Sequence, residues 1–173
     1  MEQKLKDKLS SLKLIVADVD GTLTDGYKYY SAEGQVMKRF SVRDGLGMVL
    51  LEEIGIKTAI LTTDNSPIVE SRMRDLRVVE VVQGSKSKDK GFLEICGRCD
   101  IKPENAAMLG DDMNDLHAFE VAGLKVSTAD AHYTVMDAAD LTLDTKGGEG
   151  AFRELADKIF EAKGIKPTLK KNW

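Results

Sequence analysis

Short apolar runs and amphipathic stretches alternate along the chain. The runs have the length of buried strands and lie at residues 12–17, 57–62, 78–82, 106–110, 124–127 and 140–143. Apolar residues at helical spacing predict helices at residues 46–54, 66–76, 88–98, 113–122 and 149–162. This alternation predicts an α/β fold, a three-layer Rossmann-like open parallel sheet with helices on both faces, in which ligands bind at the carboxyl ends of the strands.

The segments outside this alternation have other patterns. The first eleven residues are a polar, lysine-rich lead. Two polar and aromatic stretches between Tyr27 and Phe40 flank Gly34, which can adopt the positive φ of a chain reversal, so we expect a β-hairpin inserted after the first strand.

The length of 173 residues predicts one domain, at residues 1–164. Residues 165–173 have no periodicity and are expected to form a C-terminal tail.

Composition and charge exclude several classes of protein. The 25 Lys and Arg residues against 29 Asp and Glu give a net charge of −4, which does not favour binding to nucleic acid or to an anionic membrane. The apolar runs are far shorter than the roughly 20 residues of a membrane helix, and the polar start does not resemble a signal peptide. We therefore expect a cytoplasmic protein that binds neither nucleic acid nor membrane. Cys96 and Cys99 are expected to be incidental reduced thiols, because a zinc site needs two further ligands.

Two acidic clusters directly follow predicted strands. Asp18 and Asp20 come after the first strand and point to the same side of the chain. The cluster Asp111-Asp112-Met113-Asn114-Asp115 follows a later strand and opens a helix. Each cluster alone is equally typical of turns and helix caps. If the two strands are neighbours, however, hard oxygen ligands from both loops meet in one place and predict an octahedral Mg²⁺ site that retains water ligands.

Two further residues suit the binding of phosphate oxygens. Thr62 ends a predicted strand and offers a hydroxyl donor, whereas Lys88 opens a predicted helix and offers a cation. Singly, they are more typical of a turn and of a solvated surface. The order of motifs is Asp-x-Asp-Gly-Thr, a strand-ending Thr, a Lys at a helix start and Gly-Asp-Asp, each placed against a strand or helix. In that order the chain resembles the haloacid dehalogenase-like phosphatase superfamily over residues 12–160.

The resemblance implies hydrolysis of a phosphomonoester through an aspartyl-phosphate intermediate. Asp18 would be the nucleophile, and Asp20 would protonate the leaving alcohol and later activate water. Such an attack on a phosphate dianion needs nearby positive charge, which Mg²⁺ and Lys88 would supply. The remaining implied roles concern ligands: phosphate binding by Thr62, Thr63 and Lys88, metal binding by Asp18, Asp111 and the backbone carbonyl of Asp20, and support of the metal shell by Asp112 and Asp115.

Within the superfamily the chain looks like the 3-deoxy-D-manno-octulosonate 8-phosphate phosphatase family. The resemblance rests on Asp18 to Gly26, the hairpin, Phe40 to Gly45, Gln83-Gly84, Gly110 to Asp112, Ala129 to Ala131 and Gly147 to Ala151. Larger members of the superfamily insert a cap domain over the site. The stretch between Asp20 and the first helix and the stretch between Thr62 and Lys88 are both too short to hold one. In that family four subunits assemble around the hairpins and a neighbouring chain covers each active site, which implies a homotetramer here. The resemblance also implies that Arg72 approaches the adjacent subunit's site and that Asn114 binds substrate.

One departure concerns the choice of substrate. Octulosonate phosphatases usually have Thr-Gly-Arg after the second strand, whereas this chain has Thr62-Thr63-Asp64. Phosphatases of nine-carbon sialic-acid-type 9-phosphates carry an acid there, and Asp64 would favour hydrogen bonds to sugar hydroxyls. We expect a phosphorylated 3-deoxy-2-keto sugar acid, with the eight-carbon compound as the first candidate and the nine-carbon compound as the alternative. A further alternative is a non-catalytic oligomerisation or regulatory domain of sialic acid metabolism. A mutase, which transfers a phosphoryl group between positions of a sugar, would need a cap domain to retain its intermediate, and the sequence shows none.

Overall fold

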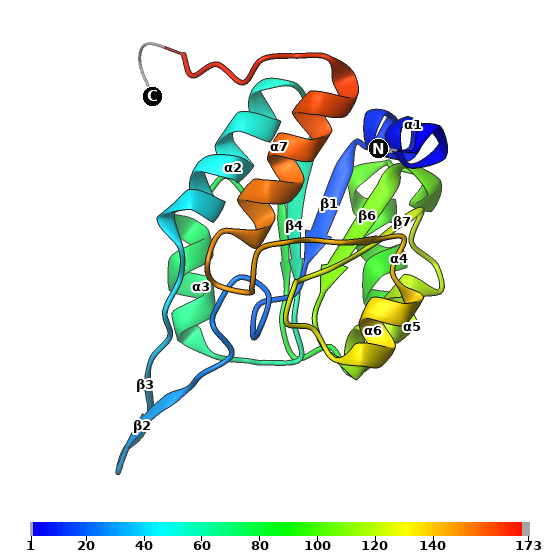
Figure 1. The fold of residues 1–173 in the computed structure, drawn as a ribbon. Helices are drawn as coiled ribbons and strands as arrows, with labels where there is room; N and C mark the ends of the chain where they lie inside the picture. The colour runs from blue at the N-terminus through cyan, green and yellow to red at the C-terminus, as the bar shows by residue number, and fades with distance from the viewer. Residues whose placement is uncertain (1, 171–173) are drawn as a thin grey trace.

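A parallel sheet sandwiched between helices forms the centre of the computed structural model, which describes residues 2–170 (Figure 1). The strands run in the spatial order β5-β4-β1-β6-β7-β8, and every neighbouring pair is parallel. Their bounds are β1 Leu14–Ala17, β4 Lys57–Leu61, β5 Glu80–Val82, β6 Ala106–Gly110, β7 Leu124–Ser127 and β8 Leu141–Thr142. The predicted Rossmann-like fold is confirmed, with β1 at its centre.

Helices cover both faces of this sheet. The core on one face includes α1 (Gln3–Ser11), α2 (Val42–Glu53), α3 (Pro67–Arg74) and α7 (Ala151–Lys163). The core on the other face includes α4 (Lys88–Cys99), α5 (Leu116–Phe119) and α6 (Tyr133–Ala138). In β1, Ile15 and Ala17 belong to the first core and Leu14 and Val16 to the second, because successive side chains of a strand point to opposite faces. This explains why the run is apolar without alternation.

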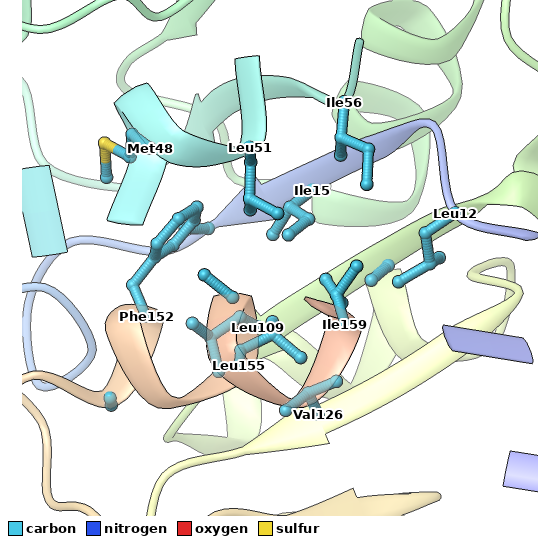
Figure 2. Packing of buried hydrophobic residues seen from close by; sticks show 14 of the residues in the cluster. Leu12, Ile15, Met48, Leu51, Ile56, Leu109, Val126, Phe152, Leu155 and Ile159 are labelled. Carbon is cyan, nitrogen blue, oxygen red and sulfur yellow. The ribbon is translucent and has the colours of Figure 1, made fainter. Parts of the chain in front are cut away.

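The first core is built mainly by α2 and α7 against the sheet. Figure 2 shows Leu51 of α2 and Phe152 and Ile159 of α7 converging on Ile15 of β1. All four side chains are buried, and full burial of each contributes about 1.5–3 kcal/mol. This packing fixes the central strand, and with it the loop that follows its carboxyl end.

Two of the predicted elements differ from the structure, and two elements of the structure were not predicted. The polar lead is helix α1, because Leu5 and Leu9 lie one turn apart and pack into the first core while the lysines face outward. The helix expected at residues 113–122 is a 3-10 turn, Met113–Asp115, followed by the short α5, because the Asp115 side chain folds back onto the preceding loop. Helix α6 was not predicted. A further 3-10 turn spans Pro103–Asn105.

The predicted hairpin after β1 is confirmed. Strands β2 (Tyr29–Ser31) and β3 (Gly34–Met37) pair antiparallel and project away from the body of the protein (Figure 1). Gly34 at the reversal has φ +125°, a value that side chains rarely adopt. A bridge between Thr24 and Phe40 closes the base of the hairpin.

Three other expectations concern the tail, the thiols and the membrane. Residues 165–170 have no regular structure and run over α2 and α7, whereas residues 171–173 of the predicted tail lie outside the described residues. Cys96 and Cys99 are buried free thiols of α4, and burial together with Cys99 raises the pKa of Cys96 to about 11. Between residues 2 and 170, no helix is both long and apolar enough to cross a bilayer.

Candidate active site

The predicted acidic loops meet at the carboxyl edge of the sheet. Strand β1 pairs with β6 on one side and with β4 on the other, so the loops after these three strands lie next to each other. The backbone N–H of Asp18 donates to the carbonyl of Leu109 at 3.0 Å, which ties the first loop to β6. The condition for a shared site, that the two acid-bearing strands are neighbours, is therefore met.

Three carboxylates gather between these loops. Asp18, Asp111 and Asp115 each place an oxygen within 4.8 Å of the others, and Asp18 and Asp115 are buried. The Thr22 hydroxyl donates to Asp111 Oδ1 at 2.7 Å and fixes one of these side chains. Asp115 Oδ2 accepts from the backbone N–H groups of Asp111, at 2.9 Å, and Asp112, at 3.3 Å. Asp115 therefore holds the second acidic loop closed on itself.

Lys88 lies against this cluster at the first residue of α4. Its side chain is 1% exposed, and its Nζ lies 2.9 Å from Asp18 Oδ1 and 2.5 Å from Asp115 Oδ1. Burial opposes the charge on this lysine, but the two carboxylates outweigh it and raise the pKa of Lys88. Lys88 is therefore a buried cation fixed between the two acidic loops.

The charge of the cluster is not balanced by Lys88 alone. Burial, with repulsion from Asp115, raises the pKa of Asp18 to about 7. Burial also raises the pKa of Asp111 to about 8, with a contribution from Asp18. Among the described residues, Asp18 Oδ1 receives no well-directed hydrogen bond, although Lys88 is close. Three crowded carboxylates with one cation and an unsatisfied buried oxygen fit a divalent metal with oxygen ligands.

The side chain of Asp20 lies outside this cluster, against two lysines of the hairpin segment. Lys38 contacts Asp20 Oδ1 and also lies 2.5 Å from Asp64 Oδ2. Lys28 lies 3.2 Å from Asp20 Oδ2 and 3.6 Å from Asp64 Oδ1. Sequence reasoning did not find Lys28 and Lys38, because lysines in a hairpin look like solvated surface residues and no motif marks them. The acid at position 64 thus lies within an ion-pair network.

The other predicted site residues lie around this centre. Thr62 is buried at the end of β4, and its Oγ1 accepts from the Asp64 N–H at 3.1 Å. Thr63 and Asn114 are exposed in the loops after β4 and β6. Asp112 is exposed and caps the turn at the Met113 N–H.

Arg72 is the one predicted site residue that faces elsewhere. It extends from α3 to the Phe40 ring, with its guanidinium carbon 6.0 Å from the ring centroid. Within residues 2–170, no ion pair joins Arg72 to the carboxylate cluster. The structure of a single chain thus brings Asp18, Asp111, Asp115, Lys88 and Thr62 to one edge of the sheet and leaves Arg72 aside.

Comparison with known proteins gives the family. Residues 30–123 match the haloacid dehalogenase-like hydrolase family. The 3-deoxy-D-manno-octulosonate 8-phosphate phosphatase KdsC of Haemophilus influenzae is 39% identical over 160 residues, which cover 92% of this chain and 89% of the relative. The phosphatase KdsC of Escherichia coli strain K12 is 37% identical over 157 residues, which cover 91% of this chain and 84% of that relative.

Solved structures agree with these relatives. The octulosonate phosphatase of Moraxella catarrhalis, in complex with a magnesium ion, a phosphate ion and KDO, has a TM-score of 0.90 and 32% identity, with 95% of this chain and 94% of that chain covered. The cobalt-bound phosphatase of H. influenzae has a TM-score of 0.89 and 40% identity, with 91% of this chain and 92% of that chain covered. Because sequence and structure agree over nearly the whole chain, this protein belongs to the haloacid dehalogenase-like hydrolases, in the family of 3-deoxy-D-manno-octulosonate 8-phosphate phosphatases.

Proposed function

We propose that the protein hydrolyses 3-deoxy-D-manno-octulosonate 8-phosphate to the free sugar acid and inorganic phosphate, with Mg²⁺ as cofactor. One observation carries the proposal: the buried cluster of Asp18, Asp111 and Asp115 with Lys88 occupies the carboxyl edge of a fold shared with a relative that binds magnesium, phosphate and KDO. The relatives do not favour the nine-carbon substrate or a non-catalytic domain. The chain is a phosphatase of the haloacid dehalogenase-like class.

The residues fit a magnesium ion. Asp18 and Asp111 would hold it with their carboxylates, and Asp20 would add its backbone carbonyl. The ion supplies positive charge that offsets the repulsion between an anionic nucleophile and a phosphate dianion. Asp115 keeps the loop of Asp111 in place through its two backbone contacts, and Asp112 caps the following turn.

The chain's own residues divide hydrolysis into two steps. A carboxylate oxygen of Asp18 attacks phosphorus, the bond from phosphorus to the C8 oxygen breaks, and Asp20 donates a proton to that oxygen. A water then attacks the aspartyl phosphate while Asp20 takes its proton, which releases phosphate and restores both carboxyl groups. Lys88 and Thr62 hold the phosphoryl oxygens, and Thr63 borders the same site.

A trapped phosphoenzyme tests this mechanism. Acid quench after mixing with labelled substrate and Mg²⁺ is expected to yield labelled protein from the wild type and none from Asp18→Asn. The matched control, Asp137→Asn, changes an exposed carboxylate of α6 and is expected to label like the wild type. Turnover without any acid-stable label, or a label that persists in Asp18→Asn, contradicts the assignment of Asp18 as nucleophile.

The choice between the eight- and nine-carbon substrates depends on more than the charge of residue 64. Asp64 contacts Lys38 and Lys28, so its charge is offset within the chain. Burial works against the charge of this carboxyl, but the two lysines outweigh it and lower the pKa of Asp64. We therefore expect kcat/KM to be higher for the eight-carbon acid phosphate. A direct comparison of the two substrates at fixed Mg²⁺ measures this, and a preference for the nine-carbon compound would overturn it.

A homotetramer formed through the hairpin is also part of the proposal. The hairpin projects from the body and exposes Tyr30, Val36 and Met37, and a two-stranded ribbon gains stability when such apolar surface is covered. In that assembly Arg72 would approach a neighbouring site and Asn114 would contact substrate. Light scattering after size-exclusion chromatography tests the mass, and a monomer would contradict the proposal. We also propose that the enzyme works in the cytoplasm.

A further inference from the structure

An ion-pair network surrounds the Asp20 carboxyl. Its four members come from three separate segments: Asp20 from the loop after β1, Asp64 from the loop after β4, and Lys28 and Lys38 from the two ends of the hairpin. The hairpin therefore delivers two cations into the site in addition to forming an exposed ribbon.

Lys38 is the enclosed member of this network. Its side chain is 0% exposed, whereas that of Lys28 is 34% exposed. An enclosed ammonium group costs free energy unless carboxylates pair with it, and Lys38 contacts both Asp20 and Asp64. Lys38 is therefore fixed in one place by two carboxylates from different loops.

Asp64 is in turn anchored by the backbone. Its Oδ1 accepts from the Asn65 N–H at 3.0 Å, and its own N–H donates to Thr62 Oγ1 at 3.1 Å. Asp64 Oδ2 faces Lys38. A continuous series of contacts thus runs from the end of β4 through Asp64 and Lys38 to Asp20.

We propose that Asp64 and Lys38 are positioning residues that hold the Asp20 carboxyl toward the leaving oxygen of the substrate, with Asp64 acting through Lys38. The proposal rests on the proposed function, in which Asp20 is the acid that protonates this oxygen. The enclosed Lys38 contacts Oδ1 of Asp20 and sets the orientation of the carboxyl, whereas Oδ2 lies beside the more exposed Lys28 and is the oxygen that would carry the transferred proton. Acid catalysis depends on such placement, because the acid must lie within hydrogen-bond reach of the atom that it protonates.

The test uses substrates that differ in their need for an acid. The sugar alkoxide of the octulosonate phosphate leaves only with a proton, whereas p-nitrophenolate leaves without one. Asp64→Asn keeps the size of the side chain and removes the charge that anchors Lys38. We expect kcat/KM to fall about 10-fold for the sugar phosphate and by less than about 2-fold for p-nitrophenyl phosphate. An equal loss with both substrates, or no loss, overturns the proposal.

A double mutant separates positioning from a direct role. If Asp64 acts through Asp20, Asp64→Asn causes no further loss of kcat/KM in the Asp20→Asn background. The same loss in both backgrounds overturns the proposal. The matched control is Asp140→Asn, which removes an ion pair with Lys8 at 3.0 Å and is expected to leave both substrates unaffected.

The proposed function has its own readout in this series. Asp20→Asn alone must lower kcat/KM for the sugar phosphate far more than kcat/KM for p-nitrophenyl phosphate; kcat/KM is the readout because it reports phosphoryl transfer to Asp18 and not the later hydrolysis, which both substrates share. If it impairs both equally, the role of Asp20 as acid is wrong, whatever Asp64→Asn does. If Asp20→Asn discriminates and Asp64→Asn does not, only the positioning role is wrong.

Discussion

Lys88 and Asp115 form an ion pair of 2.5 Å in which the side chains are 1% and 0% exposed. The pair joins the first residue of α4 to the loop after β6. Asp115 uses its other oxygen to hold the backbone of that loop. The cation beside Asp18 and the loop that carries Asp111 are therefore fixed by one side chain.

Asp115→Asn is expected to destabilise the protein. The carboxylate accepts from Lys88 with one oxygen and from two backbone N–H groups with the other, but an amide has only one oxygen. Because Lys88 keeps its pair with Asp18, the cost is that of the hydrogen-bond donors left unsatisfied, and the free energy of unfolding is expected to fall by about 1–3 kcal/mol. Urea unfolding followed by circular dichroism measures the change, with Asp137→Asn as the exposed control. Equal stability of wild type and Asp115→Asn would contradict the account.

Magnesium affinity is expected to rise with pH. Burial and neighbouring carboxylates raise the pKa of Asp18 to about 7 and that of Asp111 to about 8, so both hold protons at lower pH. Metal binding must displace these protons, and affinity therefore falls as pH decreases from about 8 to about 6, by up to about 10-fold per pH unit for each proton displaced. Titration calorimetry at several pH values tests this, and a constant affinity across that range would refute it.

Gly21→Ala is expected to weaken metal binding. Gly21 has φ +86°, and a Cβ built there would lie 2.0 Å from Asp111 Oδ2, so Asp111 would have to move. Displacing a residue that orients a metal site costs about 10–100-fold in affinity. The matched control is Gly55→Ala, which has a similar φ of +79° but nothing within 4 Å. If Gly21→Ala binds Mg²⁺ as tightly as Gly55→Ala, the contact with Asp111 does not control the affinity and the prediction is wrong.

Asp44 is expected to give the stability a pH dependence. Burial raises its pKa to about 6, so in the folded protein Asp44 stays protonated to a higher pH than in the unfolded chain. The contribution of Asp44 to stability is therefore greatest at low pH and falls as pH rises from about 4 to about 6, by at most about 1.4 kcal/mol per unit. Asp44→Asn keeps an acceptor for the Arg153 N–H and is expected to show a smaller slope than the wild type, because Asp18 and Asp111, whose pKa values are also raised, still contribute in the same direction. Urea unfolding across that range compares the two, and parallel profiles would contradict the assignment.

Local patterns were sufficient for most of the fold. Strands β6 and β7 lie at the residues expected, because short apolar runs between turn residues encode buried strands within a few positions. The acidic loops were found for the same reason, since Asp18 and Asp111 directly follow such runs. Helix α1 was missed because its few apolar residues are significant only when α7 covers them.

The sequence by itself determined the alternation of strands and helices, the hairpin and the acids and lysine of the phosphatase motifs, since each is written in a short window of residues. Only the tertiary structure decided which of these groups share an environment. The strand order places Asp20 and Asp64 beside Lys28 and Lys38, and it places Asp115 rather than the Asp20 side chain with Asp18 and Asp111. The physical reason is that burial and pairing of charges depend on contacts between segments far apart in the chain, which no local pattern specifies.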